Sequence, residues 1–184
     1  MFNEKKVAQM AAFFLGKSMG MMPVMKLLKL LYLSDRESMN RYGEPITYDA
    51  MVSMPNGPVL SRTYEFINGA ARSMPEGWES WISDRENHKV SLRREVVRDD
   101  LLELSDSDLD VMDSVWLQFG KMDQWQLSNY THFYCAEWQD PHGSSKPITY
   151  QDVFKALGKD ATIAAEMQDD ILANKQVDRL FLGL

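Results

Sequence analysis

The chain has a single cysteine, Cys135, among its 184 residues. One thiol cannot form a disulfide within the chain, so the fold has to hold without covalent crosslinks, and a reducing, cytoplasmic location is expected. The sequence also lacks any stretch approaching the ~20 apolar residues that a membrane-spanning helix needs. We therefore expect no membrane partner.

Basic residues are fewer than acidic ones: 20 Lys and Arg stand against 27 Asp and Glu, which gives a net charge of -7 at pH 7. A protein that binds nucleic acid unaided usually needs a concentrated basic face, because neutralising phosphates dominates its affinity. We expect no direct nucleic-acid contact. An acidic surface fits a basic protein partner better.

Motifs of catalysis and metal binding are scarce. The sequence contains no Gly-rich phosphate loop, nucleophile elbow or paired-carboxylate motif. A zinc site would have to combine His132, Cys135 and His142 with a borrowed carboxylate, whereas structural zinc usually has four ligands in closely spaced pairs. A Cys135–His132 nucleophile pair is the enzymatic alternative. We expect no metal, no cofactor and no catalytic residue.

Helical periodicity dominates the rest of the chain. Apolar residues make up 45% of it, an ordinary globular share that favours one domain over residues 1–184. Apolar spacing and helix-start signals predict helices at about 3–19, 23–40, 58–70, 105–119, 123–131, 149–157 and 160–182. Three of these starts carry a capping box, namely Ser105 with Asp108, Asp123 with Gln126 and Thr149 with Asp152.

Two segments have the alternating pattern of extended chain. Residues 46–54 alternate apolar and polar positions, which predicts one buried face. Residues 71–98 suggest a β-hairpin that includes Trp78 and Trp81 and turns at Asn87-His88. The predicted fold is therefore mainly α (α+β), a single compact domain of about seven helices with a small β-hairpin.

The segment Lys26–Glu37 is apolar nearly all round a helix and then ends in charge. Such a helix belongs at the centre of the core, so we expect Leu28 and Leu31 to be buried. Asp35 is expected to pair with neighbours at the rim of the core, because an unpaired buried charge is costly. Arg36 is open to either a structural or a binding role.

Several short motifs together resemble a known family. They are Lys29-Leu30-Leu31-Tyr32-Leu33-Ser34-Asp35-Arg36, Pro45-Ile46-Thr47, Gly57-Pro58-Val59, Leu104-Ser105-x-x-Asp108 and Leu127-Ser128-x-x-Thr131-His132 with Trp138 after it. In this order and spacing they resemble the Panacea domain, also called the SocA-like antitoxin domain, over about residues 5–160, with a C-terminal helix at about 160–182. Asn56 stands where family members often have a tyrosine.

The resemblance implies an antitoxin of a bacterial or phage type II toxin–antitoxin pair. Such a protein neutralises a cognate toxin, encoded nearby, by direct protein–protein binding. One branch of the family resembles a proteolytic adaptor that delivers its toxin to a ClpXP-type protease, which is the alternative function. An enzyme using His132 and Cys135 is a further alternative.

Tight neutralisation requires a few aromatic or arginine anchors rather than scattered charge. On this ground and from the family motifs, we expect the partner-binding residues to be Lys29, Tyr32, Arg36, Pro55, Gly57, Pro58, Trp78, Trp81, His132 and Trp138.

Overall fold

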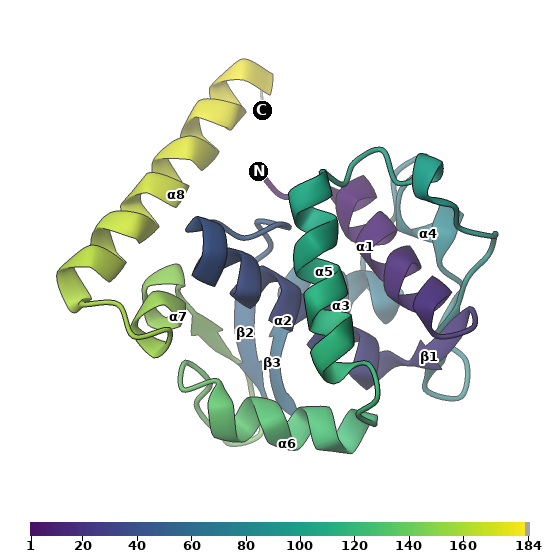
Figure 1. Cartoon of the computed structure of the whole chain (residues 1–184), viewed down its shortest axis with the longest axis horizontal. Coiled ribbons are helices and arrows are strands. Elements are labelled where there is room, and N and C mark those ends of the chain that lie inside the picture. The colour runs from purple at the N-terminus through teal and green to yellow at the C-terminus, as the bar shows by residue number, and fades with distance from the viewer. Residues whose placement is uncertain (183–184) are drawn as a thin grey trace.

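The computed structural model describes residues 1–182, with the side chains at 178, 179, 181 and 182 excepted. Within this range the chain forms eight α-helices, one short 3-10 helix and five short strands (Figure 1). The elements are α1 (Glu4–Lys17), β1 (Met21–Pro23), α2 (Val24–Tyr42), β2 (Met51–Met54), β3 (Gly57–Leu60), α3 (Ser61–Ile67), α4 (Trp78–Trp81), β4 (Lys89–Ser91), η1 (Arg98–Asp100), α5 (Asp106–Phe119), α6 (Gln124–Tyr134), β5 (Lys146–Ile148), α7 (Tyr150–Ala156) and α8 (Ala161–Leu182). The predicted class, mainly α with a small β component, is confirmed.

Helix α2 lies at the centre of the molecule, in contact with α1, α5, α6 and β3 (Figure 1). Leu27, Leu30 and Leu31 are fully buried, and Leu28 is nearly so. Each fully buried leucine contributes roughly 1.5–3 kcal/mol through the hydrophobic effect. The helix ends at Gly43, whose φ of 80° is the left-handed conformation typical of a helix C-terminus.

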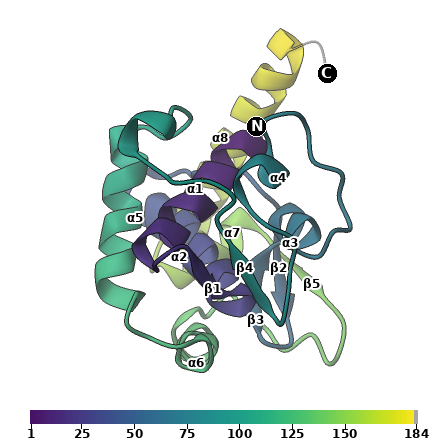
Figure 2. The same cartoon turned by 90° about the vertical axis from the view of Figure 1, so that its right-hand side faces the viewer.

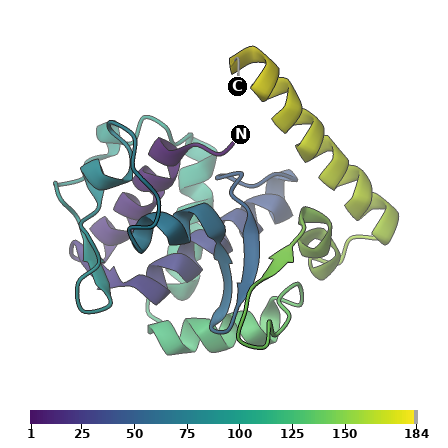
Figure 3. The same ribbon diagram turned by 180° about the vertical axis from the view of Figure 1, so that it is seen from behind.

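The strands form two small antiparallel sheets (Figures 2 and 3). In the larger sheet β2 lies between β3 and β5, and β2 pairs with β3 in the register Val52 opposite Val59 and Met54 opposite Gly57. This register leaves only Pro55 and Asn56 to connect the two strands. The smaller sheet pairs β1 with β4.

All three predicted capping boxes are present. The Ser105, Asp123 and Thr149 side chains accept hydrogen bonds from main-chain N–H groups of α5, α6 and α7, and in each case the residue three positions later bonds back. These local devices satisfy N–H groups that have no partner within the helix.

The prediction that a helix starts at Pro58 is wrong. Residues 57–60 form strand β3, and α3 starts at Ser61. The Asp49 carboxylate accepts hydrogen bonds from the N–H groups of Arg62 and Thr63, at 3.0 and 2.9 Å. The capping group for α3 thus comes from 13 residues upstream, where a local sequence pattern does not reveal it.

The predicted hairpin in residues 71–98 is partly correct. Asn87 and His88 form its turn with φ values of 49° and 60°, and Glu86 pairs with Lys89. Beyond the turn the hairpin continues with Ile82 opposite Leu92, and the N–H groups of Ser83 and Arg93 donate to the carbonyl oxygens of Ser91 and Trp81. Strand β4 also pairs with β1. Trp78 and Trp81 instead form α4 and are 3% and 2% exposed. Both side chains therefore belong to the hydrophobic core.

The C-terminal helix α8 packs mainly against α7 and extends away from the rest of the molecule (Figures 1 and 3). Ala164 and Ile171 are buried on it, while Ile163, Leu172 and Val177 are at least 43% exposed. Across residues 1–182, none of the helices combines the length and the apolar character that crossing a membrane requires.

Candidate partner-binding site

Several positions of the sequence motifs converge on one turn, which we call the 54–58 turn (Met54–Pro58). Lys29 of α2 donates from Nζ to the carbonyl oxygen of Pro58 at 2.8 Å. Ser128 of α6 donates from Oγ to the carbonyl oxygen of Asn56 at 2.9 Å. Two helices that are about 100 residues apart in the sequence thus both bind the same turn.

Trp138, in the segment after α6, also binds the 54–58 turn. Its indole Nε1 donates to the carbonyl oxygen of Met54 at 2.9 Å. The imidazole of His132 lies flat against this indole, with ring centroids 4.0 Å apart. His132 therefore supports the side chain that holds the turn.

Gly57 is the one position of this turn where a side chain does not fit. Its φ of 102° lies in the region that favours glycine. A Cβ atom there would lie 2.5 Å from Oγ1 of Thr131 and 2.8 Å from Nζ of Lys29. The Gly-Pro-Val motif thus reflects close packing of the turn on α2 and α6.

Lys29 is an unusual member of the site because its side chain is only 1% exposed. Burial lowers the pKa of its amine to about 7, since water no longer stabilises the charged form; the nearby Cys135 opposes this shift. Its hydrogen bond to Pro58 satisfies one of its donors.

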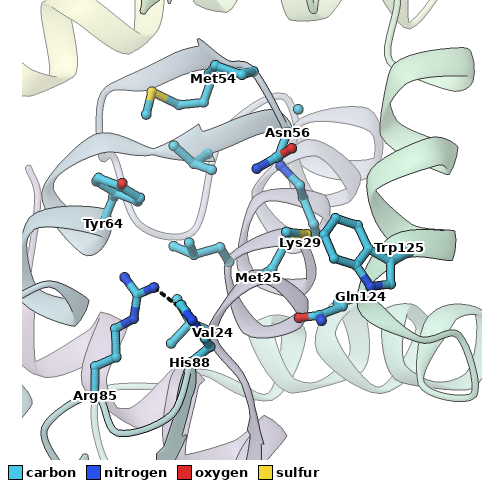
Figure 4. A pocket seen from close by; sticks show the side chains of 14 residues that line it. Val24, Met25, Lys29, Met54, Asn56, Tyr64, Arg85, His88, Gln124 and Trp125 are labelled. Carbon is cyan, nitrogen blue, oxygen red and sulfur yellow. Dashed lines mark hydrogen bonds between the residues drawn. The ribbon is translucent and has the colours of Figure 1, made fainter. Parts of the chain in front are cut away.

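Beside the 54–58 turn lies a cavity of about 570 Å³ (Figure 4). Val24 and Met25 of α2 contribute apolar lining, and Trp125 of α6 lines the cavity with 59% of its surface exposed. Arg85 and His88 approach from the hairpin, and in Figure 4 they lie across the cavity from Trp125. The backbone N–H of Val24 donates to the carbonyl oxygen of His88, which joins the hairpin to the start of α2.

Tyr32 and Arg36 both bind Glu137, whose side chain is fully buried. The Tyr32 hydroxyl donates to Oε1 of Glu137 at 2.5 Å, and Nε of Arg36 donates to the same oxygen at 2.7 Å. Burial, with the adjacent Glu137 charge, raises the pKa of Tyr32 well above its usual value. This arrangement joins α2 to the segment that carries Trp138 and gives Arg36 a structural role.

Asp35 is buried on α2 and accepts hydrogen bonds from the N–H and hydroxyl groups of Thr47. Burial raises the pKa of its carboxyl to about 7, while the Thr47 hydrogen bonds oppose the shift. The prediction that Asp35 pairs at the rim of the core is wrong. Asp35 is instead completely buried, and its partner is a threonine in the loop that follows α2.

The enzymatic alternative does not find support in the geometry around Cys135. Burial raises the pKa of its thiol to about 12, whereas a nucleophilic cysteine needs a lowered pKa. The His132 ring stacks on Trp138, and its Nε2 atom is buried without a hydrogen-bond partner in the described structure. Nor do the residues that the structure describes include a cluster of three His, Cys, Asp or Glu side chains arranged to hold a metal ion.

The structure brings most of the predicted site residues together and separates two of them. Around the 54–58 turn lie Lys29, Pro55, Gly57, Pro58, His132 and Trp138, with Tyr32 and Arg36 bound to the adjoining Glu137. Trp78 and Trp81, which were predicted to bind the partner, do not line the cavity; both are buried in the core as part of α4, which contacts α1. Sequence reasoning missed Arg85, His88 and Trp125 as cavity residues. The capping box at Asp123 predicts that Trp125 lies on a helix. It does not predict which surface of the molecule the Trp125 side chain faces.

The fold and the site define a small, mainly helical domain in which side chains of α2, α6 and the segment after α6 bind the main chain of a single turn. The sequence matches the family model described as antitoxin SocA-like, Panacea domain, over residues 27–139, and the chain therefore belongs to this family. The matched segment extends from α2 to just beyond Trp138, so it contains the three side chains that hold the turn. Comparison with curated proteins and with solved structures gave no match.

Proposed function

We propose that the chain is a cytoplasmic antitoxin of a bacterial or phage type II pair, and that it neutralises a cognate protein toxin by binding it directly. The proposal places the binding surface at the 54–58 turn and the adjoining cavity. The observation that carries it is the convergence of Lys29, Ser128 and Trp138 on the carbonyl oxygens of this turn. Membership of the antitoxin family supports the same function.

A turn held in this way suits tight binding. A loop that is ordered before it meets its partner loses less conformational entropy on association, which leaves more of the interaction energy for affinity. Nanomolar affinity corresponds to about -12 kcal/mol. Reducing the entropy cost at the centre of the interface is therefore useful to an antitoxin.

The surface beside the turn offers the residue types that carry interface energy. Trp125 is exposed next to the cavity, and Arg85 lines it. Tryptophan and arginine are enriched among residues whose loss weakens binding most. Pro55 and Asn56 are exposed at the tip of the turn, so they can contact a partner directly.

This role requires no catalytic residue, metal or cofactor. The raised thiol pKa of Cys135 and the stacking of His132 on Trp138 favour structural roles for both residues. We infer a binding protein rather than an enzyme.

The test is to express the adjacent open reading frame in cells with and without this protein. We expect a toxic neighbour whose toxicity disappears on co-expression, and a complex that copurifies. The variant Trp125→Ala should weaken rescue, whereas Leu117→Ala, which removes a side chain that is 86% exposed on α5 and does not line the cavity, should not. A toxic neighbour that is not rescued would contradict the pairing.

Repeating the experiment in cells that lack ClpXP separates sequestration from the adaptor alternative. Direct neutralisation predicts full rescue without the protease and an unchanged toxin level. Rescue that depends on the protease, with loss of the toxin, would replace our proposal by the adaptor function.

A further inference from the structure

The charge of the cavity beside the 54–58 turn differs from that of the whole chain. Lys29, Arg85 and His88 line it, and no Asp or Glu of the described residues does. The chain as a whole has 27 acidic residues against 20 basic ones. A cavity without carboxylates in such a protein favours an anionic group on whatever occupies it.

Four acidic residues are adjacent in sequence to the lining, namely Glu65, Asp84, Glu86 and Asp123, and none of them lines the cavity. Asp123 precedes α6, and its carboxylate accepts hydrogen bonds from the N–H groups of Trp125 and Gln126. Glu86 follows Arg85, but it lines a different cavity together with residues of β4.

Arg85 is held in place by neutral partners. Its guanidinium donates to Oδ1 of Asn68 and to Nδ1 of His88, the latter at 2.7 Å. In the part of the chain that the structure describes, it forms no ion pair with a carboxylate. A guanidinium has five N–H donors, so donors remain for a ligand.

The contact with Arg85 also determines the form of His88. Arginine has no acceptor, so Nδ1 of His88 accepts the hydrogen bond and the proton of the neutral ring lies on Nε2. Arg85 and His88 together therefore offer N–H donors in one corner of the cavity, and Figure 4 shows their side chains side by side.

We propose that this cavity binds an acidic side chain, Asp or Glu, that is flanked by a large apolar residue in an exposed segment of the partner protein. The carboxylate binds at Arg85 and His88, and the apolar side chain packs on Met25 and Trp125. A volume of about 570 Å³ suits a short segment of chain. This inference rests on the proposed function, because it specifies the chemistry of the toxin surface that the antitoxin recognises.

The test uses the purified full-length chain and three sets of short synthetic peptides. The first set has capped ends and pairs one Asp or Glu with a neighbouring Phe or Leu. The second set replaces the acid by Asn or Gln, and the third has no acidic side chain but a free C-terminal carboxylate. Binding is measured by titration, with the indole N–H resonance of Trp125 as the local probe, assigned by its loss in Trp125→Phe.

We expect the acidic peptides to bind and to shift the Trp125 resonance, with affinity at least tenfold higher than that of the amide peptides, as for a charge-assisted hydrogen bond. Arg85→Gln should abolish this difference. Arg98→Gln is the matched control, because Arg98 is also exposed but pairs with Asp106 away from this cavity. Should Arg85→Gln fail to fold, His88→Phe, which removes the Nε2–H donor of the ring, provides the same comparison.

Equal affinity for acidic and amide peptides, absence of binding by every acidic peptide, or a preference for the free C-terminal carboxylate would each overturn the inference. Full rescue of a toxic neighbour by folded Arg85→Gln would overturn it too, while leaving the antitoxin function intact. Conversely, a neighbour that is toxic but not rescued would reject the antitoxin function, even where the acidic peptides bind as expected.

Discussion

The indole N–H of Trp138 lies 2.9 Å from the carbonyl oxygen of Met54, a residue 84 positions earlier in the sequence. This hydrogen bond joins the end of the family-matched segment to the end of β2. Together with the bonds from Lys29 and Ser128, it fixes the main chain of the 54–58 turn.

Replacing Gly57 by alanine should destabilise the protein by more than the loss of a favourable backbone conformation, which costs about 1 kcal/mol. The added Cβ would lie 2.5 Å from Oγ1 of Thr131, so the turn has to move away from α6. Gly143→Ala is the matched control, because Gly143 also has a positive φ but has no atom near its Cβ position. Equal losses in chemical denaturation would contradict the close packing.

Arg36→Ala should lower the free energy of unfolding by about 3 kcal/mol, because it leaves a buried carboxylate without its cationic partner. Glu137 is that carboxylate, and it also binds Tyr32. Arg41→Ala removes a more exposed ion pair with Glu37 on the same helix and should cost about 0.5 kcal/mol. Urea denaturation of the two variants measures the difference, and similar losses would refute the structural role of Arg36.

Trp81→Ala and Trp125→Ala should have opposite consequences. Trp81 is 2% exposed in the core, so its truncation should cost about 3–5 kcal/mol of stability. Trp125 is 59% exposed, so its truncation should change stability by less than about 0.5 kcal/mol while weakening partner binding. Thermal unfolding and copurification with the toxin test both statements. A stable Trp81→Ala that fails to bind would instead show that Trp81 is a binding residue.

Lys29 should make stability depend on pH above neutrality. Its pKa is about 7 in the folded protein and near 10.5 in the unfolded chain. Between these values the unfolded state binds more protons, so this group makes the free energy of unfolding rise with pH. The free energy of unfolding of the native protein, relative to that of Lys29→Met, should therefore rise by roughly 3–5 kcal/mol from pH 7 to pH 10.5. A difference that is constant over this range, measured by denaturation in matched buffers, would contradict the lowered pKa.

Leu31→Ala should cost about 2–5 kcal/mol, since it leaves a cavity in the centre of the core. Leu31 is fully buried on α2, whereas Leu117 on α5 is 86% exposed and supplies the same substitution outside the core. Comparison of their denaturation midpoints tests the position of α2, and a fully stable Leu31→Ala would show that the core assignment is wrong.

Features of the fold that depend on neighbouring residues could be predicted from the sequence. The capping boxes at Ser105, Asp123 and Thr149 predicted the starts of α5, α6 and α7 because each box consists of residues three positions apart. The start of α3 could not be predicted in this way, because the carboxylate that caps it belongs to Asp49. Pro58 suits the first turn of a helix, but pairing with β2 prevailed.

In the candidate site, too, some residues could be predicted from short sequence motifs and others could not. Gly57, Lys29 and Trp138 were predicted from the family motifs, and they meet at one turn. Arg85 and His88 belong to a hairpin whose position follows from the pairing of β4 with β1, and such a distant pairing leaves no local pattern. The burial of Trp78 and Trp81 was missed for a related reason: aromatic residues are common both in cores and at interfaces.

Lys29, Ser128 and Trp138 all bind carbonyl oxygens of the main chain in the 54–58 turn, and none of them binds a side chain there. Every amino acid has such a carbonyl, so the scaffold specifies the path of the turn without specifying what the turn displays. The side chains at positions 55 and 56 can then diverge between relatives at little cost to folding. One framework can in this way acquire new partners by substitution at its tip.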